Sequence, residues 1–151
     1  MTTAHGLAEL KALAGKDLGH SSWLEMTQDR VNLFADATND HQWIHTDAEK
    51  AKEGPFGGTI AHGYLTLALV IPFFTELLEI QGVRMSINYG LDKVRFPSPV
   101  KVGDRIRLAA TVASVDDVPG DGVQMAMDFT IEIEGSTKPA CAARALLRHY
   151  T

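Results

Sequence analysis

Titratable side chains are concentrated in one segment of the chain, residues 34–67. Fewer than 30 residues of this segment hold Asp40, His41, His45, Asp47 and His62. Turn-forming residues surround them, namely Gly54, Pro55, Gly57, Gly58 and Gly63. A packed core does not need this composition, whereas acid/base catalysis requires carboxylate and imidazole groups close together. The segment is therefore the candidate reaction site, and proton transfer is the chemistry that it favours.

Asp40 and His45 are the strongest pair in this segment. Asp40 directly follows the expected end of a helix, and His45 lies five positions later. Taken alone, Asp40 fits a turn and His45 fits an ordinary surface histidine. Together, in a loop that precedes a strongly apolar stretch, they favour a catalytic site. Asp47 has a structural explanation, because Asp47-Ala48-Glu49 is typical of a helix N-cap with an acidic first turn.

His62 and Gly63 stand at the expected start of the apolar helix. Backbone N–H groups at a helix start have no partner within the helix and can receive an oxyanion. A glycine at this place lets a ligand approach the backbone closely. The alternative is that Gly63 only allows close packing.

The same side chains are acceptable metal ligands, which makes a metal site the rival use of the segment. No His-x-x-x-His pair on a helix accompanies them, so we expect no metal. Gly57-Gly58 lacks the Lys-Ser/Thr of a phosphate loop. The chain has no Gly-x-Ser-x-Gly elbow, and Cys141 falls in an expected strand without a His–Asp signature. Nucleophilic catalysis is therefore weakly supported.

Composition narrows the class of protein. The formal net charge of −5 argues against nucleic acid as a partner, because phosphate binding depends on clustered lysine and arginine. Cys141 is the only cysteine, so no disulfide can form within the chain. Residues 1–17 contain no signal-like apolar run, and no apolar stretch reaches the ~18 residues of a membrane span. We expect a cytoplasmic protein with one domain over residues 1–151.

The elements before the candidate site are predicted as two helices and a short strand. A helix over residues 3–14, as an N-terminal extension, follows from three leucines at helical spacing, Leu7, Leu10 and Leu13. A short strand is expected at residues 22–26. Thr27 is typical of the N-cap of the second helix, which Asn39 would end in the left-handed conformation.

A long apolar helix is expected directly after the candidate site. Residues 40–61 form an ordered loop in this interpretation, with one helical turn at residues 48–52. The next stretch, residues 61–80, is too apolar on all sides for a surface helix and is interrupted by Pro72. It predicts a central helix, buried on several sides, that ends or bends at Pro72.

The second half of the chain alternates apolar and polar residues, which predicts strands. The alternation reverses after Asp92, and such a reversal indicates a bulge. Turns are expected at residues 119–122 and 135–137, before a last strand over residues 141–150. We therefore predict an antiparallel meander with one apolar face that the central helix covers. The architecture is α+β, a strongly bent sheet wrapped around a helix.

Two motifs resemble those of a known family. The first holds, in order, Phe34, Thr38, Asp40, Ile44, His45, Asp47, Ala51 and Phe56-Gly57-Gly58-Thr59-Ile60-Ala61-His62-Gly63. The second spans residues 88–100 and is followed by Val102-Gly103-Asp104. Together they resemble the hydratase-2 motif of MaoC-like dehydratases, the (R)-specific enoyl-CoA hydratases of the hot-dog fold. The similarity covers residues 18–150 and is greatest to the nodulation-protein-N-like branch.

The resemblance implies a single hot-dog fold, with a curved antiparallel sheet wrapped around a long central helix. It implies reversible syn addition of water to a trans-2-enoyl-CoA, giving a (3R)-3-hydroxyacyl-CoA, without a cofactor. Asp40 and His45 would be the catalytic residues that activate one water, and the Gly63 N–H would form the oxyanion hole. The implied substrate is an acyl-CoA, or the thioester of an acyl carrier protein, and the implied assembly is a homodimer.

The resemblance leaves the substrate-binding residues less defined. Many members have Gly-Asp-x-Asn-Pro where this chain has Asn39-Asp40-His41-Gln42-Trp43, which keeps the Asp–His spacing and changes the loop. We expect the acyl chain and its surroundings to involve Trp43, Phe56, His62, Leu65, Leu69 and Asn88. Candidates for the CoA phosphates are Arg84, Lys93, Arg95 and Lys101, although a solvated basic face explains most of these.

Two other functions use the same fold. A hot-dog thioesterase attacks the carbonyl of the thioester, and its usual carboxylate lies on the central helix. Here that helix offers Thr66 and no acid before Glu76, which argues against thioesterase activity. A non-catalytic acyl-CoA-binding module is the second alternative, and it would bind acyl-CoA without turnover.

Overall fold

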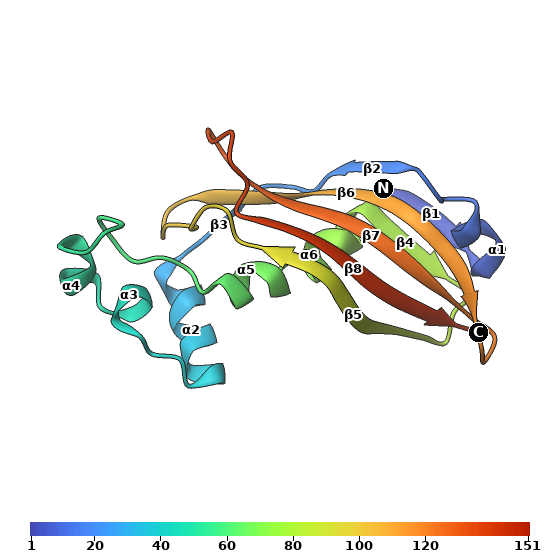
Figure 1. The fold of residues 1–151 in the computed structure, drawn as a ribbon, viewed down its shortest axis with the longest axis horizontal. Helices are drawn as coiled ribbons and strands as arrows, with labels where there is room; N and C mark the ends of the chain where they lie inside the picture. Colours follow the sequence, from blue (N-terminus) through green and yellow to red (C-terminus); the bar gives the residue numbers. More distant parts are fainter.

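A curved antiparallel sheet forms the body of the molecule, and a helical lobe extends beyond one end of it (Figure 1). The computed structural model describes residues 1–151. The six strands of the sheet are β2 (Asp17–His20), β3 (Leu24–Glu25), β5 (Met85–Arg95), β6 (Arg105–Val118), β7 (Gly122–Ile133) and β8 (Cys141–Tyr150). They run in the order β2-β6-β7-β8-β5, and β3 extends the line of β2 along β6.

The helices follow the expected order, and the central helix covers one face of the sheet. The lobe holds α2 (Gln28–Thr38), α3 (Trp43–Thr46) and α4 (Ala48–Lys52), and the central helix has two segments, α5 (Gly63–Ala68) and α6 (Val70–Leu77). Alternate residues of β8 are buried together with α6 in one core cluster, in which the rings of Phe74 and Phe129 lie 5.5 Å apart. The α+β prediction is therefore confirmed. None of the helices has the length and apolar character that crossing a membrane requires.

Pro72 interrupts the central helix upstream of the position that we predicted. The helix does not end at Pro72 but is interrupted at Leu69, and α6 continues to Leu77. A proline has no N–H and its ring clashes with the carbonyl four residues earlier, which is that of Ala68. The break therefore falls one turn before Pro72, which lies in the first turn of α6, where proline is tolerated.

The N-terminal prediction is partly wrong. Residues 2–5 form a strand, β1 (Thr2–His5), and the helix α1 is confined to Gly6–Lys11. β1 pairs in parallel with β4 (Leu78–Gln81), a strand in the stretch that we assigned to the end of the central helix. Leucine spacing could not show this pairing, because the two strands are far apart in the sequence.

The sheet contains the predicted bulge but is not a simple meander. Register shifts occur in the pairing of β5 with β8, one of them between Leu91 and Lys93, which confirms the bulge at Asp92. Strands β6, β7 and β8 follow one another as expected, whereas β5 lies beside β8 at the edge of the sheet. The free edge of β5 leaves apolar side chains exposed, namely Met85, Ile87, Tyr89 and Leu91.

Candidate active site

The caps of α2 determine where Asp40 leaves the helix. Thr27 accepts a hydrogen bond from the Arg30 N–H at 3.2 Å, as its N-cap position predicts. At the other end Asn39 adopts the left-handed conformation, with φ 57°. Both caps were predicted from the sequence and both are confirmed. Asp40 follows this turn directly, with its side chain half exposed.

His45 is buried in the lobe and has a defined tautomer. Its Nδ1 lies 2.7 Å from the carbonyl oxygen of Ile60. A carbonyl oxygen only accepts hydrogen bonds, so Nδ1 carries the proton and donates it. Nε2 therefore holds a free lone pair, and no protein group donates to it. Polar side-chain atoms that are both buried and unpaired occur only in His62 and His149. Nε2 of His45 is unpaired but is not among these buried atoms, so it remains accessible to solvent.

The titratable groups of the segment converge. His62 lies at the N-cap of α5, and its ring stacks on the ring of His45, with centroids 3.8 Å apart and planes 21° from parallel. One nitrogen from each histidine and one carboxylate oxygen of Asp40 all lie within 4.8 Å of one another. The spatial proximity of Asp40, His45 and His62 is therefore a property of the fold.

Burial keeps His45 uncharged at neutral pH. The pKa of His45 is lowered from its ordinary value of 6.5, chiefly because burial disfavours the charged ring. The hydrogen bond to the Ile60 carbonyl opposes this shift, the neighbouring His62 adds to it, and the Asp40 carboxylate again opposes it. A neutral imidazole with a free Nε2 is a competent general base.

The stacked arrangement fits acid/base chemistry better than a metal site. A metal ion must lie in the ring plane of each imidazole, along the lone pair of the coordinating nitrogen. Two nearly parallel rings stacked 3.8 Å apart cannot both direct a lone pair at one ion. In addition, Nε2 of His62 already donates to the Asp40 carbonyl oxygen at 2.9 Å. The arrangement of these groups therefore fits proton transfer better than metal binding.

Gly63 opens α5 with an unpaired backbone N–H, and the residue lines a cavity. No backbone or side-chain acceptor of the protein takes this N–H. A cavity of about 340 Å³ lies beside it, lined in part by Phe56, Gly63, Thr66 and Phe96. A Cβ at residue 63 would lie 3.2 Å from the ring of Phe96. The glycine therefore leaves room for both the ring and a ligand next to a free donor.

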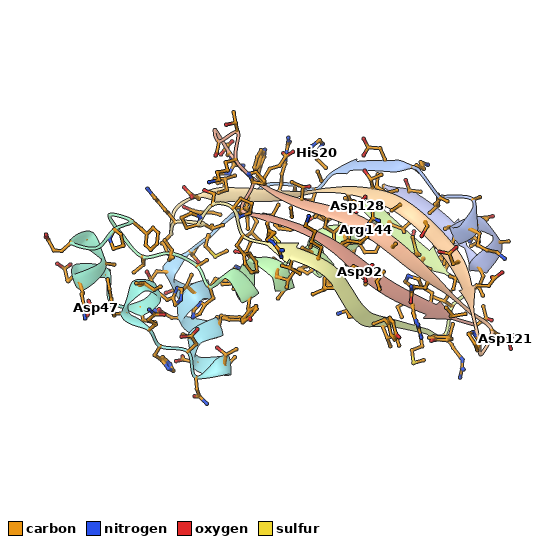
Figure 2. All side chains as sticks on the ribbon, viewed as in Figure 1. His20, Asp47, Asp92, Asp121, Asp128 and Arg144 are labelled. Carbon is orange, nitrogen blue, oxygen red and sulfur yellow. The ribbon has the colours of Figure 1, made fainter.

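The other residues singled out from the sequence lie in several places. Asp47 caps α4 by accepting from the Lys50 N–H at 3.0 Å, and Figure 2 shows it at the outer end of the lobe. His41 pairs with Asp36 on the surface at 2.9 Å. The structural explanation of Asp47 is confirmed, and His41 is not part of the cluster that Asp40, His45 and His62 form.

Most of the residues that we expected around the acyl chain do not line the cavity beside Gly63. Phe56 lines it, but Trp43 packs on Gly54 and under the Lys50 ammonium, which lies 4.8 Å from its ring centroid. Leu65 and Leu69 are core residues. Asn88 lines two other cavities, between the central helix and β5.

The supporting roles of Gln28 and Thr59 were not predicted from the sequence. Gln28 donates from Nε2 to the His45 carbonyl oxygen at 2.8 Å and accepts from the Thr59 hydroxyl at 2.6 Å. This relay joins the start of α2 to the loop before α5 and fixes the backbone of α3. An amide and a hydroxyl carry no sequence signal of their own, because their partners are set by the fold.

Comparisons with known proteins agree with this geometry. Residues 9–132 match the family described as MaoC like domain. The 3-hydroxyacyl-thioester dehydratase Z of Mycobacterium tuberculosis (strain H37Rv) is 50% identical over 149 residues, which is 99% of each chain. Nodulation protein N of Rhizobium leguminosarum bv. viciae is 43% identical, over 91% of this chain and 86% of its own length.

Solved structures place the fold in the same group. The R-hydratase PhaJ1 from Pseudomonas aeruginosa superposes with a TM-score of 0.73 at 25% identity, over 96% of this chain and 85% of its own. A monoamine oxidase regulatory protein from Archaeoglobus reaches a TM-score of 0.81 at 23% identity, over 99% and 97%. The expected hot-dog fold is thereby confirmed. Because the family match covers residues 9–132 and the Mycobacterium relative covers 99% of the chain, the chain belongs to the MaoC-like dehydratase family. It is an enzyme of the hydratase/dehydratase type.

Proposed function

We propose that this enzyme is an (R)-specific enoyl-CoA hydratase. It adds water reversibly to a trans-2-enoyl-CoA and gives a (3R)-3-hydroxyacyl-CoA. The single observation that carries the proposal is the free Nε2 of His45, which the Nδ1–H bond to Ile60 holds in place beside Asp40. The 3-hydroxyacyl-thioester in the name of the Mycobacterium relative and the R-hydratase title of the Pseudomonas structure support the substrate class and the stereochemistry.

One water molecule serves as both nucleophile and proton source in this mechanism. Nε2 of His45 and the Asp40 carboxylate hold the water between them. Its oxygen forms a bond to C3 as the C2–C3 π electrons move toward the thioester carbonyl, and its proton passes to the pair. A proton then returns to C2 from the same side, so the addition is syn and the protein is unchanged at the end. General acid–base help of this kind contributes about 10²–10⁴-fold.

The thioester oxygen gains negative charge while C3 is attacked. In our proposal the free N–H of Gly63 receives that charge, because it is unpaired and Gly63 lines a cavity. A preorganised donor stabilises the transition state more than the ground state, because the charge develops only during the reaction.

The test is hydration of crotonyl-CoA by the purified protein, followed as loss of the enoyl absorbance. A thiol reagent in a parallel reaction detects free CoA. The proposal expects hydration without CoA release. CoA release without hydration would indicate a thioesterase, and tight binding of acyl-CoA with no turnover would indicate a binding module.

The pH dependence of this reaction should reflect the lowered pKa of His45. The active form is the neutral ring, which is lost as the pH falls and Nε2 takes a proton. Because burial lowers the pKa below 6.5, that loss is shifted to lower pH. We expect the acid limb of kcat/KM for crotonyl-CoA to have its midpoint below pH 6.5. A midpoint above pH 6.5 would contradict a buried, neutral His45 as the base.

We also propose that the enzyme is a homodimer joined through β5. This strand lies at the edge of the sheet, and all but one of its residues are exposed in the single chain. An edge with free N–H and C=O groups pairs readily with another strand. Tyr89 and Leu91 are exposed by 54% and 46%, although apolar side chains favour burial.

Replacing an exposed apolar side chain of β5 with a carboxylate should therefore separate the subunits. We expect light scattering after gel filtration to give twice 16.4 kDa for the native protein and 16.4 kDa for Leu91→Asp. Glu25→Asp, on the short strand β3, is the control and should stay dimeric. A native protein that remains at 16.4 kDa at tens of micromolar would refute the dimer.

A further inference from the structure

His62 lies where two helices of the lobe, α2 and α3, meet the start of the central helix. It is 3% exposed, at the N-cap of α5. Its ring stacks on His45 of α3, and the ring of Phe34 of α2 is tilted against it at 4.8 Å between centroids. We expected His62 to bind substrate, but both of these contacts are with side chains of the protein.

Neither ring nitrogen of His62 is available to a substrate. Nε2 lies 2.9 Å from the backbone oxygen of Asp40, so it carries a proton and donates it. Nδ1 is sealed from solvent and has no hydrogen-bond partner. The ring therefore makes one hydrogen bond only, and that bond spans 22 residues of sequence to the backbone of Asp40.

Asp40 has little else to hold it. Its side chain is 53% exposed, and the hydrogen bond that it accepts from the Gln42 N–H is long, at 3.4 Å. The residue before it, Asn39, is in the left-handed conformation, a turn that does not by itself fix the next residue. The location of the carboxylate thus depends on the anchored backbone oxygen. The nearer carboxylate oxygen stands 4.0 Å from the same Nε2.

We propose that His62 is a positioning residue that sets the distance between the two catalytic groups. Its Nε2–H anchors the backbone of Asp40, and its ring face fixes the ring plane of His45. This inference rests on the proposed hydratase mechanism, which needs both groups to share one water. Reacting groups displaced by about 1 Å can lose on the order of 10²-fold in rate. The role is therefore visible in kcat although His62 does not touch the substrate.

Two substitutions separate the hydrogen bond from the stack. His62→Phe keeps a flat ring on His45 but cannot donate to Asp40, whereas His62→Gln keeps an N–H donor and loses the ring. We expect His62→Phe to lower kcat for crotonyl-CoA by about 10–100-fold with KM within about threefold, because the anchored geometry is lost. His62→Gln should recover at least part of that loss.

The control is His41→Gln, which removes a surface histidine next to Asp40 and should leave kcat unchanged. Circular dichroism and thermal melting must show that each variant is folded. Native-like kcat in a folded His62→Phe variant would overturn the proposal. So would equal losses of kcat in the Phe and Gln variants, because the hydrogen bond would then not matter.

A measurement that does not depend on activity completes the test. In ¹⁵N NMR spectra of the native protein, His62 should carry its proton on Nε2, and His45 should carry its proton on Nδ1. A proton on Nδ1 alone of His62 would overturn the anchor to Asp40. If the native enzyme does not hydrate enoyl-CoA, the proposed function fails, while the spectra still decide whether this anchor exists.

Discussion

Replacing His45 with glutamine should lower kcat for crotonyl-CoA hydration by about 10²–10⁴-fold, the range that a general base contributes. Glutamine can still hold a water molecule, but it cannot take a proton from it. Asp40→Asn should cause a loss of similar order, since the amide has the same shape and no negative charge. Both effects should fall on kcat more than on KM, because the proton moves only in the transition state.

The two variants should remain folded. The Asp40 side chain is half exposed and makes one long hydrogen bond, so its exchange for asparagine removes little stability. Asp47→Asn is the matched control, because Asp47 only caps α4 and asparagine is an equally good N-cap. It should hydrate crotonyl-CoA at the native rate. Full activity in His45→Gln or in Asp40→Asn would remove that residue from the mechanism.

Replacing Gly63 with valine should be the second large effect. A backbone N–H cannot be removed by a side-chain change, but a branched side chain can block access to it. A Cβ added at this residue would lie 3.2 Å from the Phe96 ring. The two methyl groups of valine must therefore displace the ring or enter the cavity beside it. Loss of one oxyanion donor costs about 10²–10³-fold in kcat, and we expect a loss of this size.

Two further variants distinguish a blocked Gly63 N–H from a steric clash with the Phe96 ring. Gly58→Ala is the control in the same loop, because a Cβ there meets no atom within 4 Å. It should keep native activity. Gly63→Val combined with Phe96→Ala relieves the clash with the ring but leaves the valine over the amide. Recovery of full activity in this double variant would show that crowding, and not the Gly63 donor, caused the loss.

Local signals predicted the local parts of the site well. The caps of α2 depend on Thr27 and Asn39 themselves, and α4 depends on Asp47, so each could be predicted from a few neighbouring residues. The bulge at Asp92 was predicted because a change of face in a strand leaves a direct trace in the order of apolar residues. The proximity of Asp40 and His45 was expected from the pair and from its resemblance to a known motif.

Features that depend on distant contacts could not be predicted in this way. The hydrogen bonds of His45 to Ile60 and of His62 to Asp40 link residues 15 and 22 positions apart, through groups that no pattern marks. The pairing of β1 with β4 and of β5 with β8 likewise joins strands that are far apart in the sequence. The break at Leu69, by contrast, has a local cause, because the ring of Pro72 clashes with the carbonyl one turn earlier.

A crystal structure of the Asp40→Asn variant with crotonyl-CoA bound is the most direct test of the account. It should show one ordered water between residue 40 and Nε2 of His45, next to C3 of the crotonyl group. The thioester oxygen should accept a hydrogen bond from the Gly63 N–H. A crotonyl group bound elsewhere, for example between the central helix and β5 with no water near His45, would contradict it.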